Sequence, residues 1–211
     1  MAFKDRVEAG KELALHLEKF KNEKGIVLGL PRGGVVVAKE VANKLGWPLD
    51  VFISRKISLP LNPEYAIGAI TETDTVKLNE QLISSVGNIE TSYIEEEVKR
   101  QEDEAQRRKN LFRNGEDLPD ISDKTVILVD DGIATGFTVF AAIEALKKLK
   151  PQKIIIAVPV APAEIKQDFL DYVDKFIALE TPENFLSVGQ FYDEFPQISD
   201  KEVADILKTK Q

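Results

Sequence analysis

The residues best suited to chemistry lie in one segment, ILVDDGIATGFTVFAAIEAL, residues 127–146. An apolar run leads directly to two carboxylates, Asp130 and Asp131, then to a loop of glycine and threonine, and then to a helical pattern. Backbone N–H groups at the start of a helix, with the hydroxyls of Thr135 and Thr138, form a cradle for a phosphate dianion. The carboxylates repel phosphate and are better suited to accept hydrogen bonds from a pair of sugar hydroxyls. A phosphate beside a diol indicates a ribose 5-phosphate.

A second glycine-rich loop, GLPRGGV at residues 29–35, follows another apolar run. Glycines on both sides of Arg32 suit backbone and guanidinium contacts to a pyrophosphate at a helix N-terminus. The loop matches neither G-x-G-x-x-G nor G-x-x-x-x-G-K-[ST], which disfavours a dinucleotide-binding fold and a P-loop NTPase. Considered alone, the loop is explained equally well as a tight turn without a ligand.

A pair of cations, Arg55 and Lys56, comes at the end of a third apolar run, residues 49–54. If this run is a strand, the pair lies on a loop at the edge of the sheet. Cations in such a position are solvated surface residues about as often as they are ligands. The sequence therefore leaves both interpretations open for this pair.

Short apolar runs and amphipathic stretches alternate along most of the chain. Strands are predicted at residues 25–30, 49–54, 64–71, 125–130, 153–158 and 175–180. Helices are predicted at residues 4–22, 35–46, 91–113, 137–149, 163–173 and 200–208. This alternation predicts an α/β fold, a three-layer, doubly wound sheet of about six mostly parallel strands. Such sheets bind ligands at the carboxyl ends of their strands, where the three polar segments described above lie.

The predicted helix at residues 91–113 is highly charged, with opposite charges spaced at i, i+4. This pattern is typical of a largely solvated helix with a thin apolar stripe. We expect the stripe to lean on the domain or on a second subunit, which makes a homodimer a reasonable expectation. The chain as a whole is expected to form a single domain, residues 1–211. Its core is predicted at residues 1–180, and an aromatic loop with the last helix at residues 181–211.

Composition excludes several classes of protein. The net charge is −8, which disfavours a nucleic-acid partner unless a local basic cluster forms. The chain has no cysteine and one histidine, so thiolate metal sites, a cysteine nucleophile and a histidine-rich metal centre are excluded. His16 lies among leucines and is interpreted as structural. No membrane-spanning or signal-peptide pattern occurs, and we expect a soluble, cytoplasmic protein without a membrane partner.

The segment VDDGIATGFT, residues 129–138, resembles the signature that binds phosphoribosyl pyrophosphate (PRPP) in type I phosphoribosyltransferases. Together with RKISLPLNPEYAIGAI and FLSVGQFYDEFPQISDKEV, it makes the chain similar to an uncharacterised prokaryotic branch of that family over nearly its whole length. The resemblance implies that Asp130 and Asp131 hold the ribose hydroxyls and that Arg55 and Lys56 complete the catalytic set. The residues that it implies for phosphate and pyrophosphate binding are Arg32, Gly33, Gly34, Gly132, Ile133, Ala134, Thr135, Gly136, Phe137 and Thr138.

The resemblance further implies that the strand predicted at residues 64–71 runs antiparallel to the others. It implies as well that a mobile loop after Lys56 covers the site. It also implies a hood that selects the acceptor. The hood candidates, which either line the acceptor site or close the core, are Val160, Ala161, Phe185, Phe191 and Tyr192. Hypoxanthine-guanine enzymes of the family carry an aspartate where this chain has Ala134, so that substrate class loses support. The sequence selects no acceptor base.

The function implied is that of a phosphoribosyltransferase, a pentosyltransferase of nucleotide salvage, with PRPP and a nucleobase-like small molecule as its partners. Mg²⁺ is expected as the cofactor, carried by PRPP oxygens and water without a direct protein ligand. A regulatory module that senses PRPP without efficient catalysis is the alternative, and a hydrolase is disfavoured because no G-x-S-x-G nucleophile motif occurs. Without ligand, Asp130 and Asp131 are expected to repel one another, so asparagine at both positions should leave the unfolding midpoint of the ligand-free protein unchanged or raise it.

Overall fold

The computed structural model describes residues 2–60, 62–86 and 89–208, which form two compact units. Unit 1 comprises Met1–Phe52, Leu118–Thr135 and Leu149–Gln211 within the described residues, and unit 2 comprises Ile53–Asp117 and Gly136–Lys148. Each unit is described by itself below. The single domain predicted over residues 1–211, with its core and hood segments, stays a prediction.

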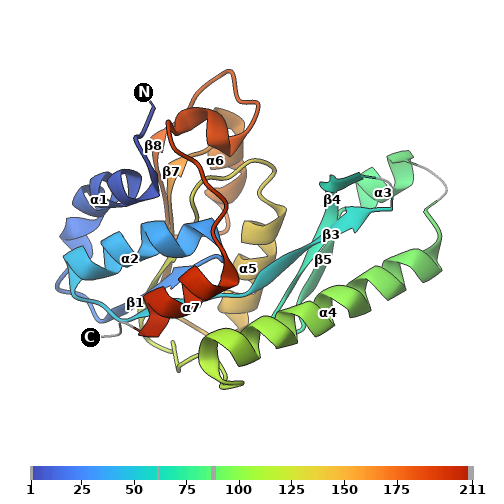
Figure 1. Cartoon of the computed structure of the whole chain (residues 1–211), viewed down its shortest axis with the longest axis horizontal. Helices are drawn as coiled ribbons and strands as arrows, with labels where there is room; N and C mark the ends of the chain where they lie inside the picture. The colour runs from blue at the N-terminus through green and yellow to red at the C-terminus, as the bar shows by residue number, and fades with distance from the viewer. Residues whose placement is uncertain (1, 61, 87–88, 209–211) are drawn as a thin grey trace. The chain divides into compact units, whose positions relative to one another are not determined.

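Unit 1 contains a parallel sheet of five strands in the order β2-β1-β6-β7-β8 (Figure 1). The strands are β1 (Gly25–Gly29), β2 (Leu49–Val51), β6 (Thr125–Val129), β7 (Lys153–Val160) and β8 (Lys175–Glu180). They arise from the continuous apolar runs of the sequence, because a strand in such a sheet is buried on both faces. The direction of strand order reverses between β1 and β6, where Gly29 pairs with Val129. This is the switch point at which open α/β sheets bind their ligands.

Helices cover both faces of this sheet. α1 and α2 pack together on one face, where Leu13 and Val41 join a buried cluster with the strand residues Val27 and Ile127 (Figure 1). The β1-to-β2 and β7-to-β8 connections run in opposite directions along the sheet, so right-handed crossovers place α6 on the opposite face from α2. The helical segments of unit 1 are α1 (Arg6–Leu17), the 3₁₀ turns η1 (Glu18–Phe20) and η2 (Val188–Phe191), α2 (Gly33–Leu45), α6 (Ala163–Phe169) and α7 (Asp200–Lys208).

Unit 2 contains a small antiparallel sheet in the order β3-β4-β5, on which α4 and α5 pack. The α/β fold class predicted from the sequence is confirmed. The predicted strand at residues 64–71 is antiparallel, but it pairs with β3 and β5, so the parallel sheet has five strands where about six were predicted. The elements of unit 2 are β3 (Ser54–Leu59), β4 (Asn62–Thr71), β5 (Val76–Leu78), α3 (Glu80–Val86), α4 (Thr91–Arg113) and α5 (Phe137–Lys148).

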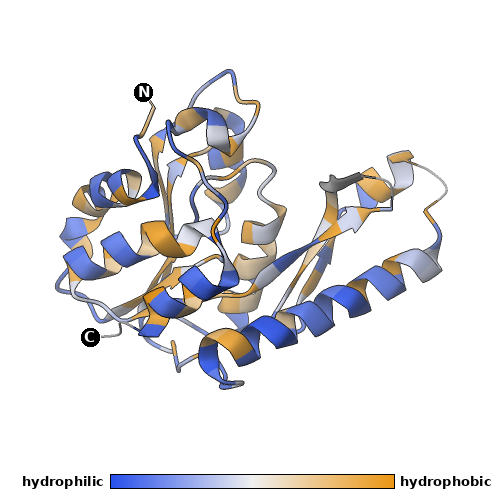
Figure 2. Ribbon diagram, in the orientation of Figure 1, coloured by the Kyte–Doolittle hydropathy of each residue, from blue (hydrophilic) through white to orange (hydrophobic). Residues whose placement is uncertain are grey.

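The long helix α4 has the limits that the sequence predicted, but its buried stripe is mainly polar. The stripe consists of Glu97, Gln101, Ala105, Arg108, Phe112 and Arg113. Gln101 donates a hydrogen bond to Glu97 at 2.8 Å, and Arg108 pairs with Glu104 at 3.0 Å. Figure 2 shows α4 as hydrophilic along most of its length. In the part of the chain that the structure describes, no helix combines the length and apolarity needed to cross a membrane.

Candidate functional site

The loops that follow β1 and β6 are in direct contact within unit 1. A Cβ atom on Gly33 would lie 1.8 Å from Oδ2 of Asp131, and a Cβ atom on Gly34 would lie 2.8 Å from Cα of Asp130. Neither space admits a side chain, so glycine at these two positions allows the loops to pack against each other. The structure thus brings the two motifs predicted from the sequence together at the switch point of the sheet.

Asp130 and Asp131 follow β6 directly and are partly buried. Oδ1 of Asp130 accepts a hydrogen bond from the backbone N–H of Asp131 at 2.9 Å. Oδ2 of Asp131 accepts one from Nε of Arg6 at 2.7 Å. Burial raises the pKa of Asp131, and the ion pair with Arg6 opposes that shift. The two adjacent carboxylates therefore have different surroundings, since one of them has a buried cation beside it.

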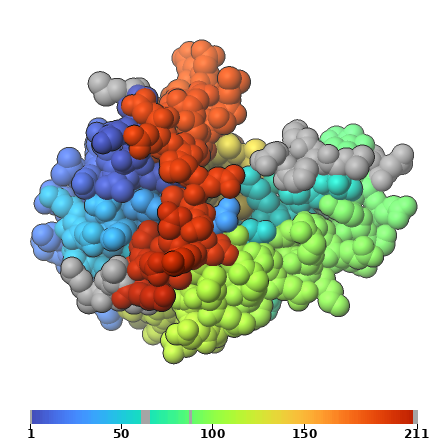
Figure 3. Space-filling view, in the orientation of Figure 1, coloured from blue at the N-terminus to red at the C-terminus, as the bar shows by residue number. Residues whose placement is uncertain are grey.

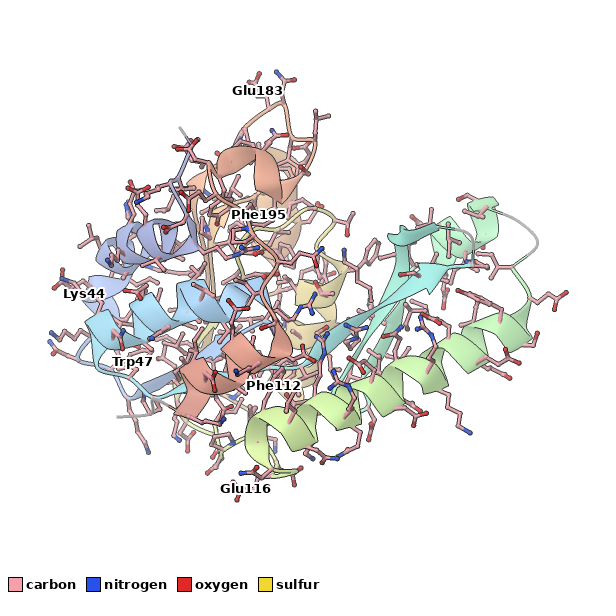
Figure 4. The ribbon with its side chains drawn as sticks, in the orientation of Figure 1. Lys44, Trp47, Phe112, Glu116, Glu183 and Phe195 are labelled. Carbon is pink, nitrogen blue, oxygen red and sulfur yellow. The ribbon has the colours of Figure 1, made fainter. Side chains whose placement is uncertain are left out.

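Arg6 is a residue of this site that the sequence analysis missed. It is the first residue of α1, which begins here because the Asp5 side chain accepts a hydrogen bond from the N–H of Glu8. The Arg6 side chain is 8% exposed. Besides pairing with Asp131, its guanidinium donates to the carbonyl oxygen of Pro196 at 2.7 Å. Its Cζ atom lies 3.7 Å from the centroid of the Phe195 ring, labelled in Figure 4.

The sequence does contain a signal for Arg6. Helical spacing places it on the same face as Gly10, Leu13 and Leu17, and this face is buried. A cation on an apolar helix face requires a partner. It also stands in the first turn of a helix, where the helix dipole disfavours positive charge. These two features together would have marked Arg6 as a residue with a buried anionic partner.

The ion pair corrects one expectation from the sequence. Asp130 and Asp131 were expected only to repel each other in the ligand-free protein, so that asparagine at both positions would leave the unfolding midpoint unchanged or raise it. Arg6 offsets the charge of Asp131. Replacing Asp131 by asparagine leaves the Arg6 guanidinium buried without its anion, and such changes are destabilising. The ligand-free double variant is therefore expected to be less stable than the wild type.

Arg32 lies immediately before α2, at the end of the loop after β1, and the peptide bond from Pro31 to Arg32 is cis. Its side chain is 40% exposed, and one terminal nitrogen lies 3.9 Å from Oδ1 of Asp200, the first residue of α7. The guanidinium end of this pair is open to solvent, although Oδ1 of Asp200 is itself buried. The Arg32 side chain is therefore accessible to an anionic ligand.

The first half of the predicted phosphate cradle is packed into unit 1. The N–H of Ile133 donates to the carbonyl oxygen of Val160 at 2.9 Å, and the Ile133 side chain is buried. A Cβ atom on Gly132 would lie 2.5 Å from a methyl group of Val188 in η2. β7 and the C-terminal segment therefore hold the backbone at Gly132 and Ile133. A ligand-binding loop needs rigid support of this kind.

The second half of the cradle is more accessible. Ala134 and Thr135 are exposed, and Phe137 and Thr138 are partly buried at the start of α5. Gly136 has a φ of 75°, a left-handed conformation that favours glycine. Its carbonyl oxygen accepts the first hydrogen bond of α5, from the N–H of Phe140 at 2.8 Å. This loop and helix start have the form predicted from the sequence, with backbone N–H groups leading into a helix.

The predicted position of Arg55 and Lys56 is wrong. The predicted strand at residues 49–54 ends at Val51, and the two cations lie inside β3 rather than on a loop. Nε of the partly buried Arg55 donates to the side-chain oxygen of Gln101 on α4 at 2.9 Å, while Lys56 is exposed. The covering loop predicted after this pair corresponds to the β3–β4 hairpin, whose residue 61 lies outside the described residues. A role of the two cations in binding PRPP stays a prediction.

The hood candidates differ in accessibility. Val160 and Ala161 are fully buried at the end of β7. Phe185 and Phe191 are partly buried, and their rings stack on each other with centroids 5.4 Å apart. Tyr192 is 6% exposed. In this structure Val160, Ala161 and Tyr192 close the core, so the partly exposed Phe185 and Phe191 are the better candidates for contact with a base.

Tyr192 contributes to the site in a way that the sequence did not predict. Its ring packs between Phe3 and Phe195, with centroid distances of 5.6 and 4.9 Å. Its hydroxyl donates a hydrogen bond to the backbone carbonyl oxygen of Asp131 at 2.6 Å. Burial raises the pKa of the Tyr192 phenol, so it remains a donor at neutral pH. Tyr192 therefore fixes the backbone of the loop that carries Asp130 and Asp131, which we call the acidic loop. It does not present a free ring face to a ligand.

Backbone pairing attaches the C-terminal segment to the start of the chain. The N–H of Phe3 donates to the carbonyl oxygen of Phe191 at 2.7 Å, and the N–H of Asp193 donates to that of Phe3 at 2.8 Å. Figure 3 shows the C-terminal segment, in red and orange-red, running beside the dark blue N-terminal residues of unit 1. The N-terminal residues, the acidic loop and the segment at residues 192–196 thus form one connected structure.

Comparison with known proteins shows the family to which the chain is similar. Residues 6–195 match the family described as the phosphoribosyl transferase domain. A protein of Mycobacterium tuberculosis, named provisionally as a phosphoribosyl transferase, is 40% identical over 205 residues. The match covers 97% of this chain but 46% of that relative, so the chain spans about half of the relative's length. The crystal structure of TT1426 from Thermus thermophilus is 39% identical, with a TM-score of 0.80, and the match covers 98% of each chain.

Proposed function

Because the chain belongs to the phosphoribosyl transferase domain family, we propose that it transfers the phosphoribosyl group of Mg²⁺-PRPP to a nitrogenous acceptor such as a nucleobase, with release of pyrophosphate. The observation that carries this proposal is the contact between the two loops at the switch point. One loop has the glycines and the exposed arginine that suit a pyrophosphate. The other has two carboxylates followed by a helix N-terminus, which suit a ribose 5-phosphate.

In the proposed reaction, the bond between C1 of the ribose and a pyrophosphate oxygen breaks, and a bond forms between C1 and the acceptor nitrogen. The pyrophosphate leaves with the bonding electron pair, and the proton of the acceptor nitrogen passes to solvent water. Positive charge develops on the ribose ring as the C1–O bond lengthens. Asp130 and Asp131 hold the ring by accepting hydrogen bonds from its hydroxyls, and their negative charge favours this state.

Arg32 is assigned to the pyrophosphate and the backbone N–H groups of residues 134–138 to the 5-phosphate. Arg32 is exposed, so its guanidinium is accessible to an anion. Arg55 and Lys56 are included as further cations for the leaving pyrophosphate on the basis of the sequence resemblance. The protein's contribution is thus the placement of two anionic groups on either side of the reacting carbon.

Mg²⁺ fits the site, because Asp130 and Asp131 bring negative charge beside the ribose hydroxyls, and the oxygens of PRPP with water would coordinate the ion. Within residues 2–60, 62–86 and 89–208, no group of three or more His, Cys, Asp or Glu residues is arranged to hold a metal ion. When bound, Mg²⁺ supplies positive charge that stabilises the leaving pyrophosphate.

Turnover tests the proposal. The protein is incubated with PRPP, Mg²⁺ and each of a panel of purine and pyrimidine bases, and released pyrophosphate is measured. We expect release of pyrophosphate that depends on the presence of at least one of the bases. We also expect the unfolding midpoint of the protein to be higher with PRPP than with ATP or NAD. A ligand at a hundredfold excess over its Kd stabilises the folded state by about 2.7 kcal/mol. Binding of PRPP without turnover would identify a sensor, and a midpoint raised by ATP or NAD but not by PRPP would overturn the site assignment.

Replacing Arg32 by alanine is expected to weaken pyrophosphate binding more than ribose 5-phosphate binding, because the guanidinium is assigned to the leaving group. Calorimetry with the two ligands separately measures this difference. Asp200→Asn is the matched control: it removes the anion beside Arg32 and should leave pyrophosphate binding as tight or tighter. Equal losses for both ligands in the Arg32 variant would mean that this residue acts through the fold of the loop.

A further inference from the structure

The buried guanidinium of Arg6 lies where α1, the acidic loop and the C-terminal segment meet. Its three contacts, to the Asp131 carboxylate, the Pro196 carbonyl oxygen and the Phe195 ring, come from two segments far from Arg6 in the sequence. We propose that Arg6 is a positioning residue for the ribose. By offsetting and orienting the charge of Asp131, it keeps this carboxylate ionised and in place to bind a ribose hydroxyl. This inference rests on the proposed function.

The need for such a cation follows from the charges at the site. Two adjacent carboxylates lie beside a place that must accept a ligand with a phosphate and a pyrophosphate group. Like charges at short range disfavour ionisation of the pair and binding of the anion. A buried cation beside Asp131 offsets one of the two negative charges. Asp131 is left 16% exposed, which leaves part of the carboxylate accessible to a hydroxyl.

The charged and titratable groups that face Asp131 come from three places. Arg6 reaches it from α1, and Asp130 adjoins it in its own loop. Tyr192 approaches from the C-terminal segment, but its hydroxyl donates to the backbone carbonyl oxygen and not to the carboxylate. Arg6 is thus the group among these that supplies positive charge. Burial raises the pKa of Asp131 and Arg6 lowers it, so loss of Arg6 should let the carboxyl group protonate at a higher pH.

The C-terminal segment explains why an arginine fits this position. A guanidinium has a planar face and several N–H donors, so it can stack on an aromatic ring and donate in two directions at once. The Arg6 guanidinium lies over the Phe195 ring. It donates one hydrogen bond to the Asp131 carboxylate and another to the carbonyl oxygen of Pro196. Lysine would retain the charge beside Asp131 but not this combination of contacts. The two roles of Arg6, its charge and its fixed orientation, can therefore be separated by substitution.

The experiment compares the wild type with Arg6→Gln, Arg6→Lys and Tyr192→Phe. The ionisation of Asp131 is followed by its side-chain carboxyl ¹³C shift in the ligand-free protein, and binding of Mg²⁺-PRPP is measured by calorimetry from about pH 5 to 8. In Arg6→Gln we expect the Asp131 pKa to rise, and PRPP binding to weaken about tenfold more at the acidic end than at the alkaline end. Arg6→Lys should keep the wild-type pKa and pH profile. In Tyr192→Phe, which loses a hydrogen bond to the Asp131 backbone but no charge, any weakening of PRPP binding should be equal at every pH.

Two results would overturn the inference. One is an Asp131 titration that is the same in Arg6→Gln as in the wild type. The other is a loss of binding in this variant that is equal at every pH, because a purely structural role for Arg6 would produce it. If Arg6→Gln does not fold, Arg6→Lys decides the matter, since a raised Asp131 pKa despite the retained charge contradicts the proposal. If the wild type does not bind PRPP, the proposed function fails, while the ligand-free titration still decides the role of Arg6.

Discussion

Replacing Asp130 by asparagine is expected to weaken PRPP binding at least tenfold and to leave the unfolding midpoint of the ligand-free protein nearly unchanged. The substitution keeps the size of the side chain and an oxygen that accepts the N–H of Asp131. It removes the charge that strengthens a hydrogen bond from a ribose hydroxyl, and such charge-assisted bonds contribute about 1.5 to 3 kcal/mol. Calorimetric titration with Mg²⁺-PRPP and scanning calorimetry of the free protein measure the two quantities.

The variant Asp131→Asn tests the neighbouring carboxylate, which is paired with Arg6. It should also weaken PRPP binding, but it should lower the unfolding midpoint as well, because Arg6 loses its buried anion. We expect a loss of about 1.5 to 3 kcal/mol in the free energy of unfolding, since asparagine still accepts a hydrogen bond but carries no charge. Wild-type affinity for PRPP in the Asp130 variant would contradict the ribose assignment. Wild-type stability in the Asp131 variant would show that the ion pair contributes nothing net to the fold.

Replacing Gly34 by alanine is expected to abolish PRPP binding and to destabilise the ligand-free protein by about 1 to 3 kcal/mol. The new Cβ atom would lie 2.8 Å from both Cα of Asp130 and the carbonyl oxygen of Val129. These are backbone atoms of the acidic loop and of the end of β6, so a side-chain rotation cannot relieve the clash. One or both loops must move, and the predicted ribose and pyrophosphate contacts then lose their relative placement. Urea unfolding and calorimetric titration measure the two effects.

Gly46→Ala is a matched control for this variant. Gly46 closes α2 with a φ of 68°, and a Cβ atom there would meet nothing within 4 Å. Alanine in this conformation costs about 1 to 2 kcal/mol through backbone strain, at the opposite end of the helix from Gly34. Stability should fall in both variants, but PRPP binding should be lost only in Gly34→Ala. Retained PRPP binding in Gly34→Ala would mean that the contact between the loops does not position the substrate.

Much of the fold could be predicted because the parallel strands are buried on both faces. The predicted limits of β8, α4 and α7 agree with the structure. The apolar run at residues 49–54 was wrongly predicted to be one strand, because it is apolar along most of its length, like the runs that do form single strands. Phe52 and Ile53 are fully buried, so the apolar pattern continues while the chain leaves β2 and enters β3. Apolar character reports burial and does not report which sheet a strand joins.

The site was predictable where its residues are adjacent in the chain and not where they come from distant segments. The carboxylates, glycines and threonines of residues 130–138 follow one another, so their spacing can be interpreted directly. Arg6 and Asp131 are separated by 125 residues, and no local pattern links them. The sequence left Tyr192 open between ligand contact and core packing, because aromatic side chains suit both. Only its contacts in three dimensions distinguish these roles.

The polar stripe of α4 also affects how unit 2 opens under native conditions. Three fully buried isoleucines, Ile57, Ile67 and Ile70, form the centre of the apolar cluster in this unit. From α4, only partly buried apolar residues such as Ile94 and Val98 pack against it, and most of the buried residues of α4 are polar or charged. Paired polar groups fix the register of a helix but add little net free energy compared with apolar burial. The backbone amides of α4 should therefore exchange with deuterium through local opening, well before those of β1 and β6, which exchange only when the large core of unit 1 unfolds.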